Sequence, residues 1–86
     1  MINSTDSYVA WALLVDELDE AREHLQGLID RMATSGAIDE EDFGVNLGHV
    51  YAHLNRAWHA RSQDREISAE QWIQFSTFPK DLDPVG

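Results

Sequence analysis

Three histidines and one glutamate have spacings that could bring them together as metal ligands. Glu20 and His24 are four residues apart, and so are His49 and His53. Residues four apart project from one side of an α-helix, so each pair offers two ligands from one helix. Neutral imidazoles and a carboxylate can bind zinc or another divalent first-row metal. If the two helices pack in a suitable register, these four side chains predict a divalent metal site.

The same histidines have a simpler interpretation as structural residues. Histidines beside a helical packing seam are commonly half-buried and hydrogen-bonded, and nearby carboxylates favour their protonated form. A third interpretation is a pH-sensitive interface, because imidazoles that face carboxylates change charge between about pH 5 and 8. His59 lies further along the chain and does not join the group. The structural interpretation is favoured, so no cofactor is predicted, and zinc or another divalent metal is the alternative.

No arrangement typical of a catalytic site is found in the sequence. The chain has no cysteine, which excludes a thiol nucleophile, a thiolate metal site and a disulfide. Its single lysine, Lys80, lies near the end of the sequence, and Gly44 and Gly48 fall inside a predicted helix rather than in a phosphate-binding loop. The Glu-x-x-His spacing of di-iron helical bundles is absent, because Glu20 and His24 are one residue too far apart. We therefore predict that the protein is not an enzyme.

Charge is divided unevenly along the chain. Residues 1–42 contain eleven acidic and two basic residues, whereas residues 43–63 contain no acidic residue, two arginines and three histidines. The net charge of -10 disfavours nucleic acid and anionic lipid as partners, since both attract clustered lysine and arginine. The longest apolar run, residues 9–15, is much shorter than the ~20 residues that span a bilayer. We expect a soluble, cytoplasmic protein with no membrane partner.

The histidine and glutamate pairs would be carried by two long helices. Apolar residues within 5–34 alternate by three and four, which predicts a helix with an apolar seam. Thr5 or Asp6 can cap its start, and Gly36 can adopt the left-handed geometry that ends a helix. Further apolar residues beside the seam make the stripe wider than one neighbouring helix needs. The seam consists of Trp11, Leu14, Leu18, Ala21, Leu25, Leu28 and Met32.

A second helix is predicted over residues 39–63. Asp39 can cap its start, and the acidic residues that follow favour the positive end of the helix dipole. About four residues separate the two helices, which favours an antiparallel hairpin. Small residues recur every four positions at Gly44, Gly48 and Ala52. Because glycine within a helix costs roughly 1 kcal/mol relative to alanine, this stripe suggests that another helix approaches closely. The seam consists of Phe43, Leu47, Val50, Leu54, Ala57 and Arg61.

A third, short helix is predicted over residues 69–76. Ser68 and Gln71 have the spacing of a capping box, and Pro79 disfavours continuation of the helix. Residues 79–86 are expected to form a loosely held tail. Three aromatic residues of this region, Trp72, Phe75 and Phe78, are expected to meet Tyr8, Trp11 and Trp58 at the open end of the hairpin.

Together these elements predict one all-α domain over residues 1–86, an antiparallel hairpin with a short C-terminal helix that dimerises into a four-helix bundle. A chain of 86 residues buries little surface alone, so a partner is favoured. The predicted function is a protein–protein interaction or assembly module, as a homodimer or with another protein. An alternative beside metal binding is an acidic mimic that occupies a basic partner surface. The expected interface residues are Gly44, Gly48, Ala52, Tyr51, Trp58, Trp11 and Trp72.

Overall fold

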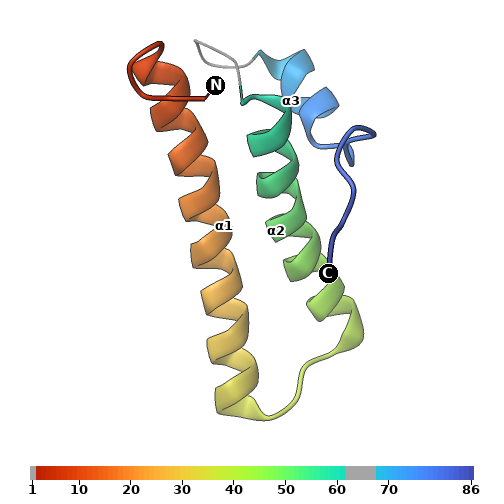
Figure 1. Cartoon of the computed structure of the whole chain (residues 1–86). Helices are drawn as coiled ribbons and strands as arrows, with labels where there is room; N and C mark the ends of the chain where they lie inside the picture. Colours follow the sequence, from red (N-terminus) through yellow and green to blue (C-terminus); the bar gives the residue numbers. More distant parts are fainter. Residues whose placement is uncertain (1, 62–67) are drawn as a thin grey trace.

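The structure is a computed structural model that describes residues 2–61 and 68–86, and it contains three helices in these ranges. α1 spans Tyr8–Ser35, α2 spans Glu40–His59 and α3 spans Ala69–Phe75. α1 and α2 lie side by side and antiparallel, and α3 lies on the side of α2 away from α1 (Figure 1). The predicted all-α hairpin with a short C-terminal helix is confirmed.

α1 begins a little later than predicted, because Ser7 caps it instead of Thr5 or Asp6. The Ser7 hydroxyl accepts a hydrogen bond from the Ala10 N–H at 3.2 Å. Asn3 holds the preceding residues in a turn, since its Oδ1 accepts from the Thr5 N–H at 2.9 Å and from the Asp6 N–H at 2.8 Å. Thr5 and Asp6 therefore precede the helix.

The other helix ends largely follow the predicted signals. Gly36 ends α1 with a left-handed φ of 71°. Asp39 stands at the N-cap of α2 without making a side-chain cap hydrogen bond, so that part of the prediction is wrong. At α3 the capping box is confirmed, because Ser68 accepts from the Gln71 N–H while the Gln71 side chain accepts from the Ser68 N–H. α2 ends at His59, so residues 60 and 61 are not helical, contrary to the prediction, and the last two predicted residues, 62 and 63, lie outside the described ranges.

α1 and α2 pack through only part of the predicted seam. Ala21 and Leu28 of α1, with Val50 and Ala57 of α2, are the buried apolar residues of the described chain. Four large side chains of the α1 seam, spaced seven residues apart, are instead 37–49% exposed. These exposed seam residues are Trp11, Leu18, Leu25 and Met32.

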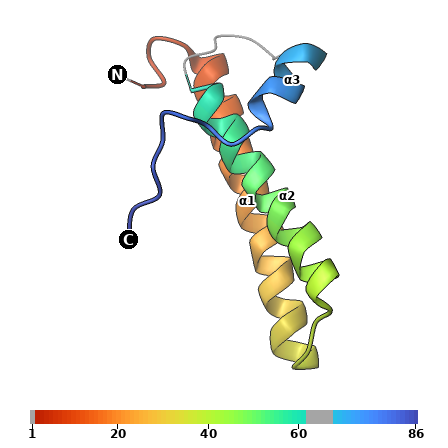
Figure 2. The ribbon, with the colours of Figure 1, turned by 90° about the vertical axis from the view of Figure 1, so that its right-hand side faces the viewer.

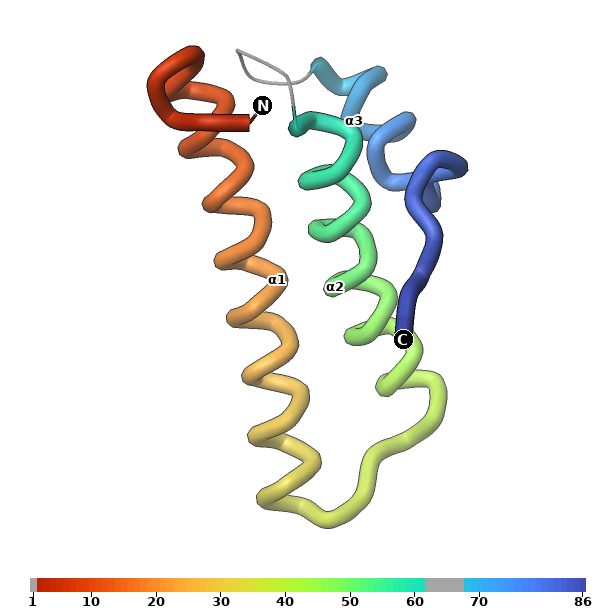
Figure 3. The backbone as a smooth tube through the Cα atoms, in the orientation of Figure 1, coloured from red at the N-terminus to blue at the C-terminus, as the bar shows by residue number. Residues whose placement is uncertain are grey.

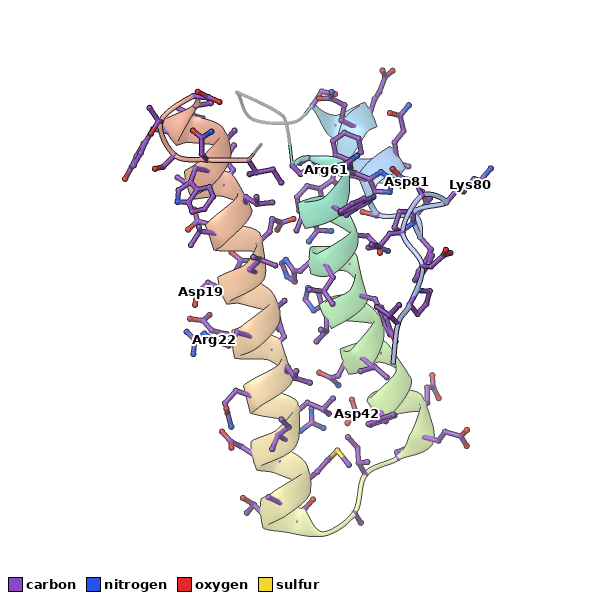
Figure 4. The ribbon with its side chains drawn as sticks, viewed as in Figure 1. Asp19, Arg22, Asp42, Arg61, Lys80 and Asp81 are labelled. Atoms are coloured by element: carbon purple, nitrogen blue, oxygen red, sulfur yellow. The ribbon has the colours of Figure 1, made fainter. Side chains whose placement is uncertain are left out.

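The α1 residues that contact α2 are spaced as in a heptad repeat, but several of them are not residues of the predicted seam. The α1 residues that face α2 include Glu17 and His24 as well as Ala21 and Leu28, which again alternate by four and three. Near the connection between the helices, Arg31 of α1 pairs with Asp42 of α2, which is labelled in Figure 4. The backbone trace shows α2 following α1 from this connection to the open end (Figure 3). Polar side chains therefore fill core positions that an apolar pattern does not reveal.

α3 packs on α2 through two ring contacts. The Trp72 ring lies over the Arg56 guanidinium, whose Cζ is 3.7 Å from the ring centroid. Phe75 stacks on His59 with the ring centroids 5.3 Å apart. Within the described ranges α3 makes no contact with α1. Figure 2 shows α3 leaning away from the pair of long helices.

The predicted contact of Trp72 and Phe75 of α3 with Tyr8 and Trp11 of α1 is therefore wrong. Tyr8 and Trp11 remain 73% and 37% exposed. The Trp58 Nε1–H donates to Asp81 Oδ1 at 2.8 Å, and the Arg61 guanidinium lies over the Trp58 ring with its Cζ 4.0 Å from the centroid (Figure 4). Trp58 thus contacts charged groups of the turn and tail, and α3 is held by cationic and aromatic residues of α2.

The contact between Trp58 and Asp81 should depend on pH. The hydrogen bond from Trp58, with a smaller contribution from Arg61, lowers the pKa of Asp81 below its usual 3.8. The contact is therefore stable above that value and is lost as the pH falls through the lowered pKa. In ¹⁵N NMR, we expect the Trp58 indole signal to shift with a midpoint below pH 3.8. Asp81→Asn should abolish this titration and Asp83→Asn should preserve it; a midpoint above 3.8 would contradict the contact.

Candidate functional site

The structure brings the three predicted histidines together between α1 and α2. The ring centroids of His24 and His49 are 4.0 Å apart, and the His53 ring is 5.1 Å from the first and 5.2 Å from the second. One nitrogen from each ring lies within 4.8 Å of the other two. We call these three residues the histidine cluster. Because they come from both helices, the cluster exists only when the hairpin is closed.

His53 is the buried member of the histidine cluster. Its side chain is 4% exposed, and its Nε2 has no hydrogen-bond partner among the described residues. Glu20 Oε2 lies 3.4 Å from this nitrogen but does not form a hydrogen bond with it. Leaving a buried polar atom unpaired costs about 1–3 kcal/mol. A ligand at this nitrogen would remove that cost.

Glu17 and Arg56 form an ion pair behind His53 that the sequence analysis missed. Arg56 Nε donates to Glu17 Oε2 at 2.8 Å, and His53 Nδ1 lies 3.0 Å from Glu17 Oε1. The Arg56 side chain is 4% exposed and the Glu17 side chain 20%. The first helix contains many acidic residues, and the sequence gives Glu17 the appearance of another solvent-exposed carboxylate. Its place in the heptad of Ala21 is the signal that could have identified it.

Glu17 determines which ring nitrogen of His53 carries a proton. Nδ1 is 3.0 Å from Glu17 Oε1 and 3.0 Å from Arg56 Nη2, and one nitrogen cannot donate to the first and accept from the second. We assign the proton to Nδ1, because otherwise the carboxylate would face a nitrogen lone pair in a buried site. Nδ1–H then donates to Glu17, which leaves the Nε2 lone pair on the side of Glu20. Metal-ligating histidines are commonly oriented by such a carboxylate.

His49 lies on the exposed side of the cluster. Desolvation of its imidazole lowers its pKa below the usual 6.5, and the nearby His24, His53 and Arg56 lower it further, while Glu20 acts in the opposite direction. At pH 7 the neutral form of His49 is therefore favoured. The neutral imidazole is the form that binds a metal ion.

A second feature is an exposed set of apolar residues on one side of the hairpin. On α1 each of these residues directly follows a heptad position that faces α2. On α2, Tyr51 and Leu54 likewise directly follow Val50 and His53, which face α1. In an antiparallel helix pair, matching flanking positions lie on the same side. We call this set the apolar stripe, and all of its members are 37–50% exposed. It consists of Trp11, Val15, Leu18, Leu25, Ile29 and Met32 of α1 with Tyr51 and Leu54 of α2.

The predicted interface residues do not form one surface in the described chain. A Cβ atom added at Gly44 or Gly48 would have no atom within 4 Å, so no described segment packs closely on them. Helical periodicity places Gly48 and Ala52 on the face of α2 away from α1. Of the aromatic members, Trp11 and Tyr51 belong to the apolar stripe, Trp58 contacts the tail and Trp72 covers Arg56.

No protein family, curated protein or solved structure matches the chain. Across residues 2–61 and 68–86, no helix combines the length and the apolar character that crossing a membrane requires. The histidine cluster and the apolar stripe are therefore the two features from which a function can be argued.

Proposed function

We propose that the protein is an assembly module that forms a homodimer through the apolar stripe, with two hairpins making a four-helix bundle. The observation that carries the proposal is the heptad spacing of the α1 residues that α2 leaves exposed. Sustained heptad spacing is typical of a helix that packs against a second partner along its length. Between Trp11 and Met32 the stripe extends about 32 Å.

The large exposed surface of the chain supports association. A compact monomer of 9.8 kDa is expected to expose about 5,200 Å². This chain exposes 6522 Å², which is about 1,300 Å² more. One partner in a stable protein interface buries about 800 Å². The excess is larger than that area, and the apolar stripe contributes to it together with the exposed tail.

The order of residues along α1 favours a second copy of the same chain as the partner. The exposed residues are nearly symmetric about the middle of the helix, so an antiparallel copy would place Leu18 opposite Leu25 and Trp11 opposite Met32. A two-fold axis requires such a self-complementary surface. Only Arg22 interrupts the stripe, and it pairs with Asp19 of its own helix (Figure 4).

Sedimentation equilibrium of the full chain at several concentrations tests the proposal. We expect a species of twice the 9.8 kDa mass, and we expect the double substitution Leu18→Glu and Ile29→Glu to weaken association at least ~100-fold by placing charges in the interface. Association should strengthen with salt, because each copy carries a net charge of -10. An acidic mimic would show the opposite salt dependence with its basic partner.

Val45→Glu is the matched control for this experiment. Val45 is 68% exposed and lies on α2 outside the apolar stripe, so the same change in chemistry should leave the dimer intact. Gly48→Leu, beside Tyr51 on α2, adds an apolar side chain and no charge, so it should weaken the dimer far less than the stripe substitutions. A chain that stays monomeric, or a dimer disrupted by Gly48→Leu but not by the stripe substitutions, would refute the proposed surface.

A further inference from the structure

We propose that the histidine cluster, with Glu20, binds one divalent first-row metal ion such as Zn²⁺ within a single chain. Three imidazole nitrogens and one carboxylate oxygen supply the four ligands of a tetrahedral zinc site. The absence of thiolates and the predominance of imidazole favour zinc and its neighbours over calcium or magnesium, which prefer oxygen. This inference does not depend on the dimer, because one chain provides all four residues.

The unpaired Nε2 of His53 is the observation that points to a ligand. Its lone pair is buried, it has no hydrogen-bond partner within residues 2–61 and 68–86, and the Glu20 carboxylate lies 3.4 Å away. Two groups with lone pairs that face each other repel unless a cation lies between them. One nitrogen of His24 and one of His49 also lie within 4.8 Å of each other and of a His53 ring nitrogen. A metal ion would pair all of these atoms at once.

The surrounding charges suit a dication. Glu17 and Glu20 contribute two negative charges, and Arg56 contributes one positive charge that is paired with Glu17 at 2.8 Å. The net charge around three neutral imidazoles is therefore -1. Glu17 also accepts the Nδ1–H of His53, so it would orient the ligating ring from the second coordination shell.

The cluster needs only side-chain movement to reach coordination distances. Ligand atoms in a tetrahedral zinc site are about 3.4 Å apart. The three histidine nitrogens, now separated by up to 4.8 Å, therefore require shifts of roughly 1 Å, whereas the Glu20 carboxylate lies near Glu17 and His53 and must change rotamer to join His24 and His49. His49 is exposed and the Glu20 side chain is 60% exposed, so both can change rotamer while the buried His53 stays in place.

Zinc titration of the untagged full chain, followed by isothermal calorimetry and by mass spectrometry of the native protein, tests this site. We expect one zinc per chain. The double substitution His24→Gln and His49→Gln should weaken binding at least ~100-fold, because it removes two ligands. Glu17→Gln should weaken binding about 10- to 100-fold, as expected for a second-shell partner. At a free zinc concentration of about 100 Kd, Tm should rise by roughly 10 °C or more and return with chelator.

His59→Gln is the matched control, because His59 lies on the α3 side of α2 and should leave zinc affinity unchanged. The Leu18→Glu and Ile29→Glu variant should also keep its zinc, which separates failure of the metal site from failure of the dimer. No zinc uptake, undiminished uptake by the double histidine variant, or one zinc per two chains would overturn the proposal. Lack of uptake would leave a proton as the partner of His53 Nε2 and support the structural interpretation of the histidines.

Discussion

Replacing Glu17 with alanine should destabilise the hairpin by about 3 kcal/mol in metal-free buffer. Glu17 accepts from Arg56 at 2.8 Å and contacts His53 Nδ1 at 3.0 Å, and both of those partners are only 4% exposed. Without the carboxylate, a buried guanidinium loses its counter-charge. Urea unfolding at fixed protein concentration, with chelator present, measures the loss as a lower midpoint.

Two further variants test whether burial is the cause. Asp19→Ala removes the exposed ion pair with Arg22 and should leave the urea midpoint unchanged, because solvent screens that pair. The double substitution Glu17→Leu and Arg56→Met replaces both charges with apolar groups and should recover most of the stability. If Glu17→Ala were as mild as Asp19→Ala, the packing of Glu17 between the helices would be wrong.

The sequence predicts the helix ends correctly where a local signal fixes them. Gly36 needs only its own backbone freedom to end α1, and Ser68 with Gln71 needs only residues three apart to start α3. The position of α3 depends instead on distant residues. Arg56 and His59 attract its aromatic rings to the outer face of α2, and a spacing rule for apolar residues does not detect such contacts.

The candidate site was predictable in its members but not in its supporting residues. Spacings of four residues identified Glu20, His24, His49 and His53, because one helical turn fixes which side chains share a side. Glu17 was missed, since an acid-rich helix hides one buried carboxylate among many solvated ones. The contact of Glu17 with His53 depends on the register between the helices, which polar core residues help to set.

The register also gives different roles to two leucines that the apolar pattern treats alike. Leu28 is 3% exposed between the helices, whereas Leu25 is 40% exposed in the apolar stripe. In the Leu18→Glu and Ile29→Glu background, which would remove any contribution of the proposed dimer, Leu28→Ala should cost about 3 kcal/mol through lost burial and a cavity. In the same background, Leu25→Ala should cost less than about 1 kcal/mol, because Leu25 buries less apolar area than Leu28. Urea unfolding measures both.

When Leu25→Ala and Leu28→Ala are compared in the chain without the two glutamate substitutions, their losses of stability should differ less. In the dimer, Leu25 would be covered by the second copy, so Leu25→Ala should cost more at high protein concentration than in the monomeric background, while the cost of Leu28→Ala should stay nearly constant. Equal losses in the monomeric background would mean that α2 packs on the whole predicted seam. A Leu25→Ala cost independent of concentration would mean that this stripe residue is not covered by another copy.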